Sequence, residues 1–183
     1  MCQYNIISLQ GQLHEMKTII AASKKYGDQV VFVDDIDFKE LSKYKWFVDK
    51  RRPSSPFYAT RNSGAKRMIR MHREILGLTD SKIHVDHIDH NGLNNQRSNL
   101  RVATHSQNMA NRKSSTRATS KYLGVCLNKI KKGGRVYNYW RADITINNKV
   151  TYLGQGKTEA EAALLYNEAA KKHHGEFANL NQL

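Results

Sequence analysis

The sequence predicts an α+β protein of two small domains, and three observations lead to this fold class. Short apolar runs, several of them alternating with polar residues, predict strands in both halves of the 183-residue chain, with short helical patterns between them. A polar and basic stretch without periodic apolar positions, residues 111–120, separates the halves. The second half ends in a helical pattern that follows three strand patterns.

The charge of the chain indicates an anionic partner. Lys and Arg number 30 against 16 Asp and Glu, which leaves +14 at neutral pH. Twelve of the cations and a single acid, Asp143, lie between Arg101 and Lys157. Since a basic surface attracts polyanions, we expect nucleic acid as the partner, although a membrane surface or a ribosome would also suit the charge alone.

Composition excludes several other classes. Hydrophobic residues make up 39% and charged residues 25%, which is typical of a globular domain. No apolar run approaches the roughly 18 residues that span a bilayer, and the N-terminus has no secretory signal pattern. Cys2 and Cys126 are far apart, which argues against a structural zinc site and a disulfide scaffold. We expect a cytoplasmic protein without a membrane partner.

The first half predicts a small mixed unit after an uninformative segment, residues 1–27. Apolar runs predict strands at 29–33, 46–48, 57–60 and 68–71, with a short helix at 35–44. The sequence PSSP at 53–56 predicts a turn. A second short helix at 72–76 ends before Gly77.

Polar residues then cluster around two strands and a helix. Asp86 and His87 stand at the end of an apolar strand, and Asn91-Gly92 is a strong signal for a tight turn. Residues 99–102 return as a second strand. Thr104 can cap a helix that runs to about residue 112. We expect the polar side chains of these three elements to converge in a compact metal site.

This segment resembles the ββα-metal motif of HNH nucleases, in the variant whose last His is Asn. Asp86-His87 is followed after twelve residues by Asn99 and after nine more by Asn108. The words "VDHIDHN", "NNQRSNLR" and "SQNMANR" are typical of HNH homing endonucleases from phage and mobile introns. The resemblance covers residues 28–113, with its core at 83–113, and implies a bacterial or phage-infected host cell.

The resemblance implies a role for each motif residue. Asp86 and Asn108 would bind one divalent cation, Mg²⁺ or Mn²⁺ rather than zinc, because their oxygen atoms are hard ligands. His87 would be the general base that deprotonates water. Asn99 would hydrogen-bond the other ring nitrogen of His87 and fix the orientation of the ring. One geometric difficulty is that neighbouring strand residues point to opposite faces, so the strand must end or bend at Asp86 and His87.

Several alternatives remain open around this motif. His105 precedes Asn108 on the same helix face and rivals it as a ligand. We interpret His84, Asp89 and His90 as loop or outer-face residues. The pair His72-Arg73 is interpreted as packing plus a phosphate contact. The expected DNA contacts of this half are Arg73, Arg101, Arg112 and Lys113.

The second half predicts three strands and a helix. Alternation predicts strands at 122–127, 139–146 and 150–153, and Asn147-Asn148 predicts a hairpin turn between the last two. Thr158 and Glu161 form a capping-box pattern. It opens a helix to about His173, with Gly175 as its stop.

This half resembles the DNA-binding domain of plant ethylene-responsive transcription factors. The matching words are "SKYLGV", "WRADI", "YLG" and "TEAEAALLYNEAAKKHHGEFANLN", which cover about residues 119–181. The resemblance implies a three-stranded antiparallel sheet that lies in the major groove. One helix would pack behind the sheet through an apolar stripe of Ala160, Ala163, Tyr166 and Ala170.

Transfer by position gives the expected DNA contacts of the sheet, with two departures. Leu123 stands where the plant domains carry Arg, and Gly156 stands where they carry an aromatic residue, so the target sequence cannot be transferred. The expected contacts are Lys121, Tyr122, Asn128, Lys129, Arg135, Trp140, Arg141, Lys149 and Tyr152.

The sequence therefore predicts four segments: residues 1–27 without a known role, an HNH nuclease module at 28–113, a basic linker at 114–118 and a DNA-binding domain at 119–183. We expect a sequence-directed endonuclease that acts on double-stranded DNA as a monomer or weak dimer. One active site per chain predicts nicking. The main alternative is a non-catalytic DNA-binding regulator that keeps the HNH fold as a scaffold. An RNA-binding protein is a third reading, although the aromatic-rich sheet motif of common RNA modules is lacking.

Overall fold

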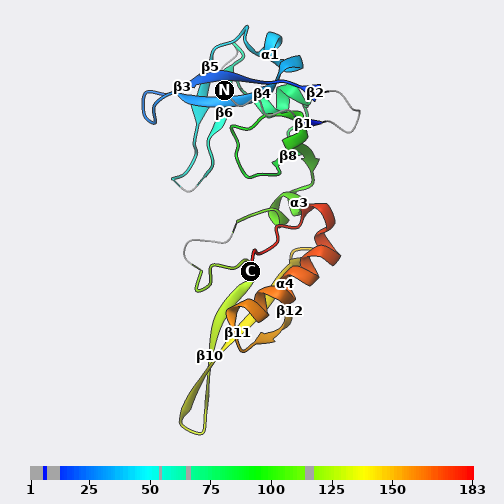
Figure 1. Ribbon diagram of the computed structural model, residues 1–183. Helices are drawn as coiled ribbons and strands as arrows, with labels where there is room; N and C mark the ends of the chain where they lie inside the picture. The colour runs from blue at the N-terminus through cyan, green and yellow to red at the C-terminus, as the bar shows by residue number, and fades with distance from the viewer. Residues whose placement is uncertain (1–5, 8–12, 54, 65–66, 114–117) are drawn as a thin grey trace. The chain divides into compact units, whose positions relative to one another are not determined.

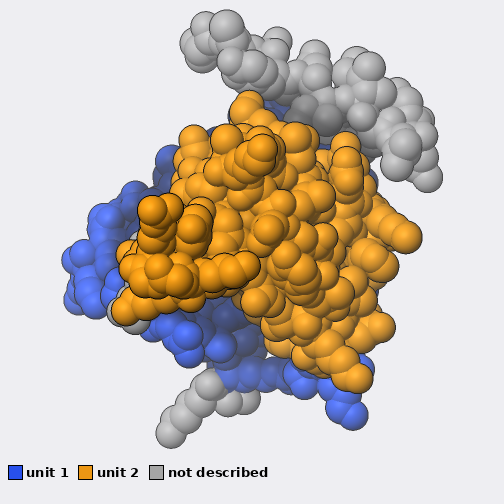
Figure 2. Space-filling view, turned by 90° about the horizontal axis from the view of Figure 1, so that it is seen from below, with its two compact units in different colours: residues 1–103 blue, residues 104–183 orange. Residues whose placement is uncertain are grey.

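A computed structural model describes residues 6–7, 13–53, 55–64, 67–113 and 118–183, and the expected linker at 114–118 lies almost entirely outside them. The chain forms two compact units, residues 1–103 and 104–183, each described by itself below (Figure 1, Figure 2). The expected boundary followed residue 113. Contacts within the chain instead group helix α3 (His105–Ala110) with the second unit. None of the helices among the described residues is long and apolar enough to span a bilayer.

The first unit is built on a five-stranded sheet with the strand order β4-β3-β5-β6-β7. Strand β3 pairs antiparallel with β4 and parallel with β5, and the pairs β5-β6 and β6-β7 are antiparallel. The strands are β3 (Met16–Ala22), β4 (Gln29–Asp34), β5 (Trp46–Asp49), β6 (Tyr58–Asn62) and β7 (Met68–Arg70).

Strand β3 lies within residues 1–27, the segment whose role the sequence left open. It lies inside the sheet, where Ile19 and Ala21 are buried against Val31 and Val33 of β4. The alternation of buried and exposed positions along β3 is the ordinary strand signal. The short pair β1 (Ile6–Ile7) and β2 (Leu13–His14) precedes it.

Two helices and a hairpin complete the first unit. Helix α1 (Asp35–Leu41) follows β4 directly, and α2 (Met71–Ile75) follows β7. Strands β8 (His84–His87) and β9 (Leu100–Ala103) form a separate antiparallel pair, joined by a long loop and the 3-10 turn η1 (Arg97–Asn99). Buried apolar residues from the sheet, both helices and this hairpin form one core, so the hairpin is packed against the sheet unit.

The second unit contains α3 and an antiparallel sheet of three strands covered on one face by α4, as expected (Figure 1). Thr104 caps α3 in a capping box with Gln107. The other elements are β10 (Val125–Lys132), β11 (Arg135–Ile146), β12 (Lys149–Gly156), α4 (Glu159–His174) and the 3-10 turn η2 (Gly175–Phe177).

Helix α4 packs through small residues and one tyrosine. Ala162, Ala163, Tyr166 and Ala170 are buried, whereas Ala160, expected in this stripe, is exposed in the first turn. The small side chains let the helix approach the sheet closely. Thr158 caps α4 by accepting a hydrogen bond from the Glu161 backbone N–H.

The first two strands of this sheet are longer than expected. They continue past the end of α4 as a two-stranded hairpin, residues 129–138, whose side chains are all exposed (Figure 1). Gly133 and Gly134 turn the hairpin with positive φ angles of 58° and 75°. The sequence of this segment, KIKKGGRVYN, lacks regular apolar alternation because neither of its faces is buried.

Candidate active site

Asp86 and His87 lie together at the end of β8, and both are buried. Strand β8 pairs with β9 up to the pair of His87 with Leu100 and then ends. The two side chains have different surroundings, as expected of neighbouring strand residues. Asp86 meets a cation of β9, whereas the ring of His87 meets aromatic rings from the sheet and α2.

Arg101 holds the Asp86 carboxylate. It lies directly opposite Asp86 in the β8-β9 register, and its Nε and Nη2 atoms both donate to Asp86 Oδ2, at 2.8 and 2.7 Å. The carboxylate is 5% exposed. The charge-assisted pair of Arg101 with Asp86 therefore lies almost entirely inside the protein. Arg101, expected as a DNA contact, takes this role in the free protein.

Two rings, those of His72 and Tyr58, pack against the ring of the candidate base His87. The ring centroid of His72 lies 5.0 Å from that of His87 at an interplanar angle of 87°. Tyr58 contacts both rings, at 5.8 Å from His87 and 5.7 Å from His72. Edge-to-face packing of this kind fixes the plane of a ring in addition to burying it.

Burial keeps both histidines neutral at neutral pH. Desolvation, and to a smaller extent the neighbouring His87, Arg70 and Arg73, lowers the pKa of His72 from 6.5 to about 2. Desolvation also lowers the pKa of His87, while Asn95 and the carboxylates Asp89 and Asp86 act in the opposite direction. A neutral imidazole is the form that can accept a proton from water.

Asn99 anchors the loop between the two strands. Its side-chain nitrogen donates to Asp89 Oδ1 at 2.9 Å and to the Asn94 carbonyl at 2.8 Å, and its oxygen accepts from the Asp89 backbone N–H at 3.0 Å. Asp89 also accepts from the Asn91 backbone N–H and the Asn94 side chain. The bonds of Asn99 thus hold the loop, and its expected bond to the His87 ring stays a prediction.

Asn95 is the buried amide that sequence reasoning missed. It is fully buried, its backbone N–H donates to the Phe32 carbonyl at 2.7 Å, and its side chain raises the pKa of His87. Within the described part of the chain, its Oδ1 atom is buried and has no hydrogen-bond partner. The Asn-rich word NNQRSN was the available signal, but it did not distinguish Asn95 from Asn94 or Asn99.

The loop is also fixed to the five-stranded sheet. The Phe32 backbone N–H donates to the Leu93 carbonyl at 2.9 Å. Asp34 accepts from the Arg97 backbone N–H at 2.8 Å, and the Arg97 guanidinium pairs with Asp37. A side chain at Gly92 would lie 2.3 Å from the Phe57 carbonyl oxygen, so only glycine fits there. The five-stranded sheet therefore positions the loop between β8 and β9, and this loop in turn fixes the ends of the two strands.

Arg73 has a structural role in the free protein. Its Nη1 donates to the Ile83 carbonyl at 2.7 Å, and its Nη2 donates to the Asp80 carbonyl. These bonds connect α2 to the segment that leads into β8. The expected phosphate contact of Arg73 stays a prediction.

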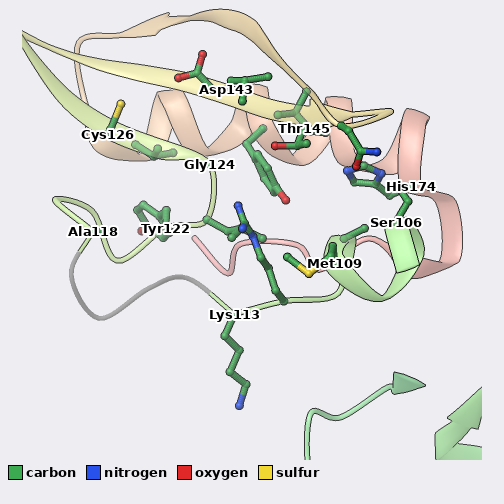
Figure 3. A pocket seen from close by; sticks show the side chains of 18 of the residues that line it. Ser106, Met109, Lys113, Ala118, Tyr122, Gly124, Cys126, Asp143, Thr145 and His174 are labelled. Atoms are coloured by element: carbon green, nitrogen blue, oxygen red, sulfur yellow. The ribbon is translucent and has the colours of Figure 1, made fainter. Parts of the chain in front are cut away.

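Asn108, the second expected metal ligand, lies on α3 in the second unit, and its partnership with Asp86 stays a prediction. The rival ligand His105 lines a cavity of about 630 Å³ in the second unit, whereas Asn108 is not among the lining residues. Arg112, Lys113 and Tyr122 also line this cavity (Figure 3). The described residues contain no group of three or more His, Cys, Asp or Glu that could hold a metal ion, so a metal site would depend on the amide and water oxygens.

The register of the three-stranded sheet divides the expected DNA contacts between its two faces. Arg141 and Tyr152 lie on the face away from α4, where the Arg141 guanidinium lies 5.0 Å from the Tyr152 ring and pairs with Asp143. Trp140 and Tyr122 instead pack against the core on the α4 side. Trp140 alternates with Arg141 along β11, so the two side chains point to opposite faces. The expected DNA contacts of Trp140 and Tyr122 stay predictions.

The remaining candidates are exposed but differ in face. Lys149 lies opposite Ile146, which packs toward α4. Residues directly opposite each other share a face, so Lys149 lies on the α4 face of the sheet and Arg141 lies on the other face. Arg135 lies opposite Lys132 on the Arg141 face, and Lys129 lies opposite Asn138 on the other face, both in the extended hairpin. Lys121 precedes the sheet, where its backbone N–H donates to Glu159.

Comparison with known proteins identifies the family to which the chain belongs. Residues 73–110, which contain all four expected motif residues, match a family model described as HNH endonuclease. A protein of Acanthamoeba polyphaga mimivirus, named as an uncharacterized HNH endonuclease, is 35% identical over 147 residues, covering 78% of this chain and 70% of the relative. Because the first unit ends at residue 103, this similarity extends into both units. No solved structure matches the chain at a significant level. The chain belongs to the HNH endonuclease family.

Proposed function

We propose that this nuclease is a metal-dependent DNA endonuclease that hydrolyses one phosphodiester per active site and so makes a nick. The observation that carries the proposal is the buried pair Asp86 and His87 at the end of β8, with a carboxylate beside a neutral imidazole. This pair supplies an oxygen ligand and a base in adjacent positions of a rigid hairpin.

His87 acts as the general base in this proposal. Its ring is held by Tyr58 and His72, and burial lowers its pKa, so it is neutral and can take a proton from the attacking water. The packing leaves the ring few alternative orientations. Proton transfer to a positioned base contributes roughly 10²–10⁴-fold to the rate.

Asp86 and Asn108 are the residues that would hold the divalent cation. A carboxylate and an amide oxygen suit Mg²⁺ or Mn²⁺, and the two bonds from Arg101 hold the Asp86 side chain in place through its Oδ2 atom. When bound, such a cation stabilises the charge that develops on the phosphate and the departing 3′ oxygen. His105 remains the alternative ligand on α3.

The second unit binds duplex DNA in this proposal through the sheet face that carries Arg141 and Tyr152. The likeness to plant ethylene-responsive domains supports this face, and the two departures from those domains have structural reasons. Leu123 belongs to the buried core under α4. A side chain at Gly156 would lie 2.7 Å from the Glu161 Cβ atom, so glycine lets α4 begin close to the sheet.

The proposal is tested by incubating the full chain with supercoiled plasmid and Mg²⁺ or Mn²⁺. We expect conversion to the open circle before any linear product, and no conversion in EDTA. Binding without conversion would favour a non-catalytic DNA-binding regulator. Simultaneous cutting of both strands by a monomer, read on a sequencing gel, would contradict the nicking part.

A further inference from the structure

The hairpin formed by residues 129–138, here named the β-arm, is the most exposed regular structure of the second unit. Its strands pair in register from Lys129 with Asn138 to Lys132 with Arg135, and every residue in it is exposed. Figure 1 shows it continuing beyond the end of α4. A two-stranded ribbon with both faces in water is only marginally stable alone, so a partner that covered one of its faces would stabilise the β-arm.

The charge of the β-arm is of one sign. Lys129, Lys131, Lys132 and Arg135 give four cations in ten residues, and the sequence of the arm contains no acid. None of its residues contributes to an ion pair among the residues that the structure describes. Such a one-sign ribbon is complementary to a polyanion.

The β-arm also presents apolar side chains that a purely electrostatic contact would not need. Ile130 and Tyr137 are direct cross-strand partners and are 48% and 52% exposed, and Val136 is 55% exposed. Ile130 and Tyr137 lie on the same face as Lys132 and Arg135 at the tip. This face therefore combines an apolar patch with two cations beyond it.

The dimensions of the β-arm suit a DNA groove. Four residues per strand at about 3.3 Å each give a reach of about 13 Å. The major groove is about 8.5 Å deep and about 12 Å wide, and it admits a two-stranded ribbon. The diglycine turn keeps the tip free of bulky side chains.

We infer that the β-arm is a DNA-binding ribbon that enters a groove of duplex DNA beside the sheet contact, with its cations on phosphates and the Ile130–Tyr137 pair against the groove wall. This inference rests on the proposed function and extends it from a sheet face to a second, projecting contact. It accounts for the length of β10 and β11, which exceeds what packing on α4 requires.

Equilibrium binding of the full chain to duplex DNA over a range of salt concentrations tests the inference. Log affinity falls as log salt concentration rises, and each lost phosphate contact makes this slope less steep by about 0.9. Lys131→Gln with Lys132→Gln should therefore reduce the steepness by up to about 2. The matched control is Lys171→Gln with Lys172→Gln, an adjacent exposed pair on α4. We expect no change of slope for the control, and equal effects of both pairs would overturn the inference.

A second measurement tests the apolar pair. Tyr137→Thr keeps a strand-forming residue but removes the ring, so we expect several-fold weaker binding with an unchanged salt slope. The hydroxyl-radical footprint should also become shorter at one end. A footprint as long as that of the wild type, for both Tyr137→Thr and the Lys131→Gln, Lys132→Gln variant, would contradict the inference. Tighter binding of the full chain to single-stranded RNA than to duplex DNA, lost in these variants, would also contradict it.

The outcomes separate this inference from the proposed function. A wild-type chain that nicks plasmid while the arm variants keep its footprint and salt slope leaves the proposed function standing and removes the inference. A wild-type chain that binds no duplex DNA removes both.

Discussion

The active-site region and the outer sheet face use polar residues in opposite ways. Around β8 and β9, polar side chains are buried and bonded to one another, as Asn99 is to Asp89 and Asn94. In the β-arm, every cation and Tyr137 are exposed and none contributes to an ion pair among the described residues, and on the outer sheet face Tyr152 is exposed whereas Arg141 is half-buried and pairs with Asp143. The first region is held by its own hydrogen bonds, whereas the second would meet a DNA groove in the proposed function.

This difference teaches how substitutions should behave in each region. A buried, bonded polar group that loses its partner destabilises the fold or misplaces a reacting group. An exposed cation that is removed changes affinity and its salt dependence, with little effect on stability. Four predictions test the contrast, in order of decreasing effect.

The largest effect is expected from His87→Ala. Loss of the base should lower the single-turnover cleavage rate roughly 10²–10⁴-fold, while the affinity for duplex DNA stays the same because the second unit is unchanged. Quenched-flow cleavage and fluorescence anisotropy measure the two quantities. A loss of affinity equal to the loss of rate would show that the regions are not separate.

Asn99→Ala should destabilise the first unit by about 1–3 kcal/mol, because it leaves the Asp89 and Asn94 groups of the loop without their partner. Asn138→Ala, an exposed asparagine of the β-arm, is the control and should stay within about 0.5 kcal/mol. Urea unfolding measures both. Equal stability of the two variants would contradict the loop-anchoring role of Asn99.

His72 predicts a pH dependence of stability. Its folded pKa is about 2 against 6.5 in the unfolded chain, so below pH 6.5 the unfolded state binds the additional proton and stability falls as the pH falls. Below pH 6.5, each pH unit lowers the free energy of unfolding by about 1.4 kcal/mol. Between pH 7 and pH 5 the wild type should therefore lose about 2 kcal/mol more of its unfolding free energy than His72→Phe. Parallel stability curves for the two proteins would show that His72 is not held neutral.

The smallest effect is expected from Arg141→Ala. It should lower the salt slope of DNA binding by about 1 and leave the melting temperature of the chain nearly unchanged. Lys149→Ala is the matched control, because the register places Lys149 on the other face of the sheet. A larger effect of Lys149→Ala would mean that DNA contacts the face covered by α4.

The sequence was sufficient to predict the secondary-structure elements whose local signals agree with their burial. Strand β8 and the Thr104 cap of α3 were predicted near their observed positions, because apolar patterning and capping chemistry are local. Strand β3 was missed although its burial alternates, since four of its seven residues are small or polar. The β-arm was missed because the strand signal comes from burial, and residues 129–138 are exposed on both faces.

The candidate site was predictable in its motif but not in its surroundings. The spacing of Asp86, His87 and Asn99 identified the hairpin, and the family match covers these residues. The ring contacts of Tyr58 and His72, however, depend on tertiary packing of β6 and α2 against the hairpin. The sheet face to which Trp140 points likewise depends on the strand register, and a shift of one residue would move its side chain to the other face.

The central claim is that one chain uses His87 to cut one strand of a duplex held by the second unit. Cleavage of a random duplex library by wild type and His87→Ala, with both strands read at nucleotide resolution, tests it most directly. We predict cuts at a defined site on one strand by the wild type and loss of those cuts, with retained binding, in the variant. Cuts of equal yield and position by His87→Ala would contradict the claim.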